Sequence, residues 1–94
     1  MTTDDGYRPI GCDQHSILEL LAMRRTTVGA RARDAAGVAF GLDAVVFDVV
    51  TRDGAEYLML RDAAGKVHQI RLDRLLSLHA PSGGLLWCQE IVVS

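Results

Sequence analysis

The chain has 94 residues, of which 49% are hydrophobic and 23% are charged, and its formal net charge is -2. This length allows one domain, and this composition excludes an intrinsically disordered chain. The slight excess of acid argues against direct RNA binding, because domains that neutralise phosphates are usually basic.

The first residues are polar and acidic, and they lack the basic and apolar regions of a secretory signal. No stretch reaches the roughly 18 apolar residues that a membrane helix needs. We therefore expect a cytoplasmic protein without membrane contact. In that compartment Cys12 and Cys88 are expected to be free thiols rather than a disulfide.

The N-terminal residues 1–12 are expected to form an extended lead-in, since Pro9 disfavours helix in the residue before it. A single domain is expected over residues 13–94. It begins with apolar residues that recur at the spacing of one helical face, and these predict a helix over about residues 14–23. Asp13 is a candidate for the N-cap of this helix.

Six short strands are predicted after the helix. The alternation at the start of this region is typical of a half-buried strand. The next strand contains the apolar run Ala44–Val50, interrupted only by Asp48, which indicates a strand covered on both sides or bent across a barrel. Asp53-Gly54 is a strong tight-turn signal, and Asp73 begins a possible helical turn. The expected strands cover about residues 26–33, 38–51, 56–61, 66–72, 75–79 and 85–93.

One helix followed by short antiparallel strands predicts a mainly β fold, a small barrel or sandwich. The run Ala44–Val50 has two interpretations: it belongs to the core, which we favour, or it forms an edge between copies of the chain. The expected state is a monomer or a small homo-oligomer.

The chain offers little chemistry for catalysis. No sequence signature of a catalytic nucleophile surrounds the cysteines. A chain of this length also has few residues left to build an enclosed active site, so we expect no enzyme activity. Cys12 and His15 have the spacing of half a zinc site, but His79 and Cys88 are too far apart to complete it. His68 is interpreted as a sheet residue. We therefore expect no metal and no cofactor.

Three strings of residues occur in a distinctive order: YRPIGCD over residues 7–13 followed by LEL over 18–20, GAEYL over 54–58, and IRLDRL over 70–75. Together they resemble the Rho-binding antiterminators, the Rof-like family, over most of residues 7–80. The resemblance implies an Sm-like fold, in which a helix caps a small bent antiparallel barrel. It also implies an inhibitor of Rho-dependent transcription termination.

The resemblance further implies binding to the hexameric terminator Rho near its primary RNA-binding site, in competition with RNA. An acidic face suits such a partner, because a surface that holds RNA must be positive. The contact residues that it implies are Tyr7 as an aromatic anchor, Asp13 and Glu19 as negative charges, and Gln14. For Asp13, the N-cap and the contact are equally favoured interpretations.

Two other functions stay open. The first is an Sm-like RNA-binding module that would use a basic run, Arg24, Arg25, Arg31 and Arg33. No aromatic residues are interleaved with this run to stack on bases, so a solvated surface is the favoured interpretation. The second is an interaction domain for an unrelated protein partner.

Overall fold

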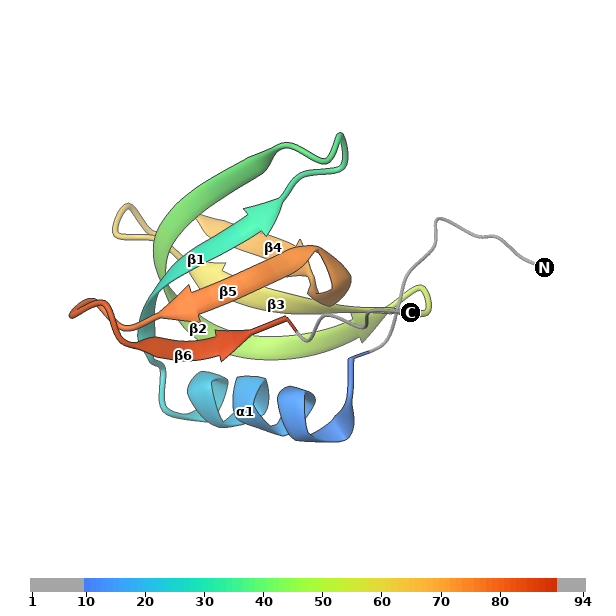
Figure 1. Ribbon diagram of the computed structural model, residues 1–94, viewed down its shortest axis with the longest axis horizontal. Helices are drawn as coiled ribbons and strands as arrows, with labels where there is room; N and C mark the ends of the chain where they lie inside the picture. Colours follow the sequence, from blue (N-terminus) through green and yellow to red (C-terminus); the bar gives the residue numbers. More distant parts are fainter. Residues whose placement is uncertain (1–9, 90–94) are drawn as a thin grey trace.

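The computed structural model describes residues 10–89 of the chain. In chain order it contains helix α1 (Cys12–Met23), strands β1 (Thr27–Arg33), β2 (Ala39–Arg52), β3 (Ala55–Arg61) and β4 (Val67–Arg71), the 3-10 helix η1 (Leu72–Arg74), and strands β5 (Leu75–His79) and β6 (Leu85–Cys88) (Figure 1). The mainly β fold with one N-terminal α-helix is thus confirmed. No helix in this part of the chain is long and apolar enough to cross a membrane.

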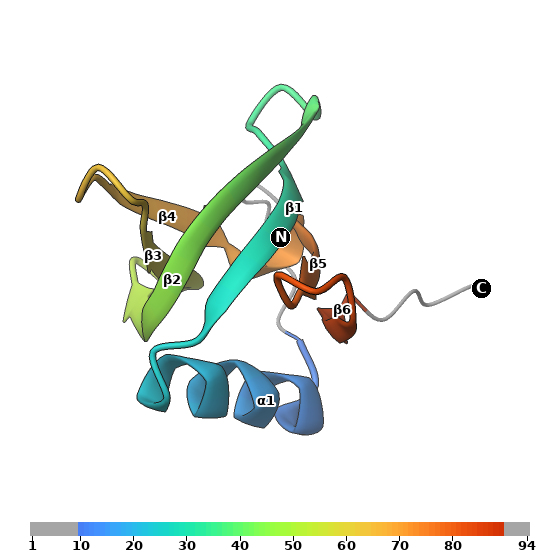
Figure 2. The ribbon, with the colours of Figure 1, turned by 90° about the vertical axis from the view of Figure 1, so that its left-hand side faces the viewer.

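The six strands form one antiparallel sheet in the order β4-β3-β2-β1-β5-β6. The sheet curls into a barrel that stays open, because its edge strands β4 and β6 are not paired with each other within residues 10–89. In two perpendicular views α1 lies across one end of this open barrel, while the loop between β1 and β2 lies at the opposite end (Figures 1 and 2).

The long strand β2 makes the bend. Its first half pairs with β1 and its second half with β3, and the register shifts at Phe47, between Val46 and Asp48. Such a bulge bends a strand and redirects a side chain. The bent-strand prediction is therefore confirmed. Along the apolar run β2 pairs with β3, and with β1 only up to Val45, so the interpretation of this run as an edge between copies stays a prediction. Ala44 and Val46 are buried in the core.

Helix α1 begins two residues earlier than predicted. Gly11 is its N-cap residue, in an extended conformation without a side-chain capping bond, and the carbonyl of Gly11 accepts a hydrogen bond of 2.9 Å from the backbone N–H of His15. The prediction that Asp13 is the N-cap is wrong, because the extended residue that starts the helix lies two positions before it. Asp13 instead lies in the first turn, where the helix dipole favours a negative charge.

At its other end α1 finishes in a Schellman motif. The backbone N–H of Thr26 binds the carbonyl of Leu21, and the N–H of Arg25 binds the carbonyl of Ala22, both at 3.1 Å. This motif needs a residue with positive φ, usually glycine, but the chain has Arg25 there with φ of 50°. The turn into β1 is therefore formed with a residue that prefers another conformation.

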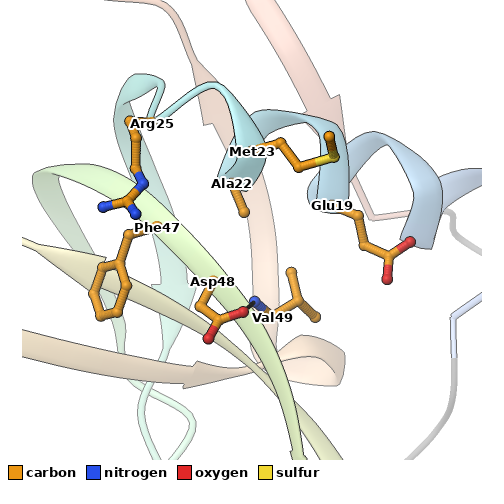
Figure 3. Close-up of a pocket in the computed structure, with 7 residues that line it drawn as sticks. All are labelled: Glu19, Ala22, Met23, Arg25, Phe47, Asp48 and Val49. Atoms are coloured by element: carbon orange, nitrogen blue, oxygen red, sulfur yellow. Dashed lines mark hydrogen bonds between the residues drawn. The ribbon is translucent and has the colours of Figure 1, made fainter.

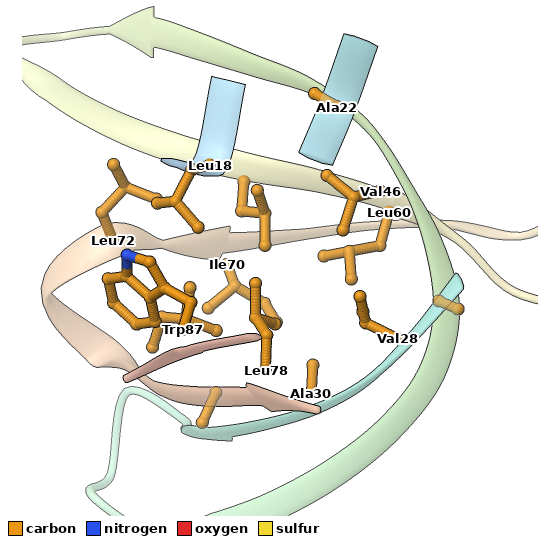
Figure 4. Packing of buried hydrophobic residues seen from close by; sticks show 14 residues of the cluster. Leu18, Ala22, Val28, Ala30, Val46, Leu60, Ile70, Leu72, Leu78 and Trp87 are labelled. Carbon is orange, nitrogen blue, oxygen red and sulfur yellow. The ribbon is translucent and has the colours of Figure 1, made fainter. Parts of the chain in front are cut away.

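The core lies between α1 and the concave face of the sheet (Figure 4). Leu18 and Ala22 enter it from the helix, and Trp87 enters from β6. Fully burying a leucine side chain stabilises a fold by about 1.5–3 kcal/mol, and several buried leucines here have no exposed surface. Those with none are Leu18, Leu58, Leu60, Leu72, Leu75 and Leu78.

Side-chain hydrogen bonds attach the last strand to α1 and to η1. The Trp87 indole Nε1 donates to the carbonyl of Gln14 at 3.1 Å, which fixes the start of α1 on β6. The amide of Gln89 donates to the carbonyls of Leu72 and Leu75, at 2.8 and 3.0 Å. Strand β6 ends at Cys88, so the last predicted strand is shorter than expected within the described residues, and its residues 90–93 lie outside them.

Candidate functional site

The surface of α1 that faces away from the sheet is unusual for a small protein. A surface helix normally has one apolar side, which packs on the core, and a polar side in solvent. Here Ile17, Leu20 and Met23 expose 41%, 43% and 80% of their surface although other apolar residues of the same helix fill the core. Val38, Phe40, Val67 and Leu85 are exposed to a similar degree elsewhere, but only on α1 do three such residues within residues 10–89 lie on one helix, which makes it a candidate surface for contact with another molecule.

Two acidic residues border these apolar side chains. Asp13 is exposed in the first turn, and the Glu19 side chain is 57% exposed. They are six residues apart, which places them about 9 Å apart along the helix axis. Neither caps the helix through its side chain, and the one contact of the Glu19 carboxylate, with His15 Nδ1 at 3.6 Å, leaves its side chain 57% exposed to an approaching partner.

A hollow of about 400 Å³ opens beside the C-terminal half of α1, between the helix and the bulged part of β2 (Figure 3). Its walls combine acidic, basic and apolar side chains, with Glu19 on the helix and Asp48 on the strand. The Phe47 ring, turned outward by the bulge, has the guanidinium of Arg61 5.1 Å from its centre. The sequence analysis missed this aromatic position, because a bulge moves a side chain without any signal in the alternation of residues.

His15 connects α1 to β3. Its Nε2 lies 2.7 Å from the Glu56 carboxylate and its Nδ1 lies 3.6 Å from the Glu19 carboxylate. The Nε2 contact has the distance of an ion pair, but it is not aligned as a hydrogen bond. Glu56, from the GAEYL string, therefore has a place beside the helix start. No group of three or more histidine, cysteine or acidic side chains within residues 10–89 is arranged to hold a metal ion.

The other string that carries the resemblance, IRLDRL, has a structural role in this region. Arg71 is 7% exposed, and its guanidinium donates two hydrogen bonds, of 2.7 and 3.0 Å, to the Asp73 carboxylate. A bidentate pair of this kind fixes geometry as well as charge. It holds η1, the single helical turn that the sequence predicts at this point.

The predicted partner-binding residues do not all have the same surroundings. Asp13 and Glu19 are both exposed on α1. Gln14, by contrast, turns toward the sheet, and its side-chain amide donates to the carbonyl of Cys88 at 2.7 Å. Gln14 therefore helps to attach the helix to β6. Tyr7 lies outside the described residues.

The four arginines of the RNA-binding alternative do not form one patch. Arg24 and Arg25 are at the end of α1, whereas Arg31 and Arg33 lie on β1, which runs away from the helix. From the helix end to Arg33 the strand extends over about 20 Å. Arg33 also donates to the carbonyl of Gly37 at 3.1 Å, and so takes part in its own turn.

A further acidic residue has a structural role at the turn between β3 and β4. Asp62 accepts hydrogen bonds from the backbone N–H groups of Ala64 and Lys66, and it lies 2.8 Å from His68 Nε2. The pKa of Asp62 is lowered, first by the hydrogen bond with His68 and then by that with the Lys66 N–H. The Asp62 carboxylate therefore stabilises the turn between β3 and β4.

Comparison with known proteins places the chain in a family. No protein-family model matches it. Two proteins, both named Protein rof, from Escherichia coli strain K12 and from Shigella flexneri, are each 32% identical to it over 87 residues. These residues are 93% of this chain and 98% of each relative, so the likeness extends over helix and sheet together. The family predicted from the three sequence strings is confirmed: the chain belongs to the Rof family.

Proposed function

We propose that this protein inhibits Rho-dependent transcription termination, by binding the Rho hexamer near its primary RNA-binding site and competing with RNA. Membership of the Rof family supports the proposal. So does the resemblance to the Rho-binding antiterminators that the sequence strings show. The observation that carries it is the exposed position of Asp13 and Glu19 on α1, where neither side chain caps the helix.

Complementary charge is the physical reason to expect this contact. A surface that binds RNA has to offer cations to the phosphates, and an acidic helix can approach the same cations. Charge complementarity of this kind raises the association rate and selects the partner. Ile17, between the two acids in sequence, and Leu20, directly after Glu19, supply apolar area that an interface can bury. Tyr7 and Gln14 complete the proposed contact set.

The RNA-binding alternative receives no support from the arrangement of its residues. Phosphate tracking requires cations that follow one groove, with aromatic rings for the bases. The arginines are instead divided between the helix end and β1. Two aromatic rings do have an arginine over them, Phe47 with Arg61 and Tyr57 with Arg52, but neither arginine belongs to the basic run.

A binding measurement with charge-reversed variants tests the proposal. The double variant D13K/E19K should bind purified Rho at least about tenfold more weakly than the wild type, because two interface charges change from attraction to repulsion. The double variant R31E/R33E reverses two charges at a distance and should retain binding. Circular dichroism checks that each variant is folded.

A same-sign control excludes an effect of net charge alone. Asp43 is exposed on β2, away from α1, and D43K, which changes the net charge by as much as D13K alone, is compared with that single variant. D43K should change Rho affinity by less than about threefold. If D13K/E19K binds Rho as tightly as the wild type, the acidic surface of α1 is not the contact. If R31E/R33E alone loses binding, the arginine surface is the contact instead.

A further inference from the structure

Four residues form a continuous stripe along the side of α1 opposite the core: Asp13, Ile17, Leu20 and Arg24. We call this set the outer stripe. Their spacing of four, three and four residues is that of the contact seam of a coiled coil. At 100° per residue they lie within about 60° of one another. In both Figure 1 and Figure 2, none of the other labelled elements lies on the outer side of α1.

The outer stripe is complementary to itself when it is reversed. Its ends carry opposite charges, an acid in the first turn and a base at the helix C-cap, and its middle carries two half-exposed apolar side chains. When two such helices lie antiparallel, Asp13 of each faces Arg24 of the other. Ile17 of each then faces Leu20 of the other. A two-fold axis between the helices produces this self-complementary arrangement.

We infer that the outer stripe of α1 pairs with the outer stripe of a second copy of this chain, in an antiparallel helix pair. Burial of Ile17 and Leu20 gives the pair its apolar seam, and the two Asp13–Arg24 contacts set its direction. A parallel pair would place Asp13 on Asp13 and Arg24 on Arg24, so charge repulsion excludes it. Met23, 80% exposed beside the stripe, adds apolar area at the edge of the seam.

The pair has to be weak. Helix α1 has 12 residues, about 18 Å of contact, which is less than the seam of a stable dimer usually needs. The expected behaviour is a monomer–dimer equilibrium that shifts with protein concentration. The dimer covers Asp13. If the proposed function holds, the dimer is therefore a form that cannot bind Rho, and self-association regulates the number of active molecules.

Sedimentation equilibrium over a concentration series up to about 1 mM tests the pairing. The wild type should show a dimer fraction that grows with concentration. D13R and R24D should each weaken association about tenfold, because each places like charges together at both ends. The charge-swapped double variant D13R/R24D should recover association to within about threefold of the wild type. L20S should abolish association while the chain stays folded by circular dichroism.

Two results would overturn the inference: a wild type that is monomeric throughout the series, or a charge-swapped variant that associates no better than the single variants. Binding of D13R/R24D to Rho separates this inference from the proposed function. A variant that dimerises but does not bind Rho supports both. A variant that dimerises and also binds Rho supports the pairing and contradicts the role of Asp13 at Rho.

Discussion

The inner and outer faces of α1 are both apolar, but the fold uses only one of them. On the inner face Leu18 and Ala22 are buried against the sheet, and Gln14 is hydrogen-bonded to β6. On the outer face Ile17 and Leu20 stay about 40% exposed. This helix therefore carries more apolar surface than its own domain buries, and we assign the remainder to contact with other molecules.

Acidic residues show the same division. Asp62 and Asp73 are bound by their own turns, through backbone N–H groups in one case and a buried arginine in the other. Asp13 has no such capping role. Asp62 and Asp73 thus stabilise turns of the fold, whereas Asp13 is exposed in the first turn of α1, where we place the function.

The strongest test of the two faces is a pair of leucine-to-alanine variants. L18A should lower the free energy of unfolding by about 2–5 kcal/mol, because it creates a cavity in the core. L20A should lower it by less than about 1 kcal/mol, since that side chain is half-exposed. Urea denaturation measures both. Equal losses in the two variants would show that the outer face also serves the fold.

A smaller effect is expected at the junction of α1 with β6. Q14A removes the hydrogen bond to the Cys88 carbonyl and should lower the free energy of unfolding by about 1 kcal/mol. S16A, at an exposed position of the same helix, is the matched control and should change it little. If Q14A is as stable as the wild type, the Gln14 side chain does not help to hold α1 on β6.

A substitution at the C-terminal end of α1 is expected to stabilise the protein. R25G should raise the free energy of unfolding by about 0.5 kcal/mol, because glycine adopts the positive φ that Arg25 is forced to adopt. Thermal melting compares it with R24G, where φ is negative and glycine should destabilise the chain. A destabilised R25G would mean that contacts of the arginine side chain outweigh its backbone strain.

The smallest predicted effect concerns pH and lies away from α1. Because the folded pKa of Asp62 is lowered, its contribution to stability is present above the ordinary value of about 3.9 and is lost as the pH falls through the lowered value. D62N should therefore show a flatter fall of stability with acid in this window, while its binding through α1 stays unchanged. An unchanged acid profile in D62N would assign the pH dependence to other groups.

Much of the fold is predictable from the sequence because the signals are local. The sequence RDAAG occurs twice, over residues 33–37 and 61–65, and folds into the same turn both times. In each, the aspartate Oδ1 accepts from backbone N–H groups two and four residues later, and the glycine has φ of 85° or 86°. Asp53 and Gly54 likewise both have positive φ, as a two-residue hairpin turn requires.

What the sequence did not predict depends on contacts between distant segments. Aspartate is a common N-cap, so the sequence favours Asp13 in that position, but Gly11 takes it without a side-chain bond. The bulge at Phe47 arises where β2 changes partner from β1 to β3. The four residues of the outer stripe can be recognised in the sequence by their spacing of four, three and four residues. That it faces away from the core follows only from the packed structure.

The most direct test of the account is a binding experiment with Rho from the same bacterium, at low and moderate salt, with and without RNA that occupies the primary site. We expect that the wild type is retained on immobilised Rho, that RNA displaces it, and that D13K/E19K is not retained. Retention that RNA leaves unchanged would contradict competition at the RNA site. No retention at either salt concentration would contradict Rho as the partner of α1.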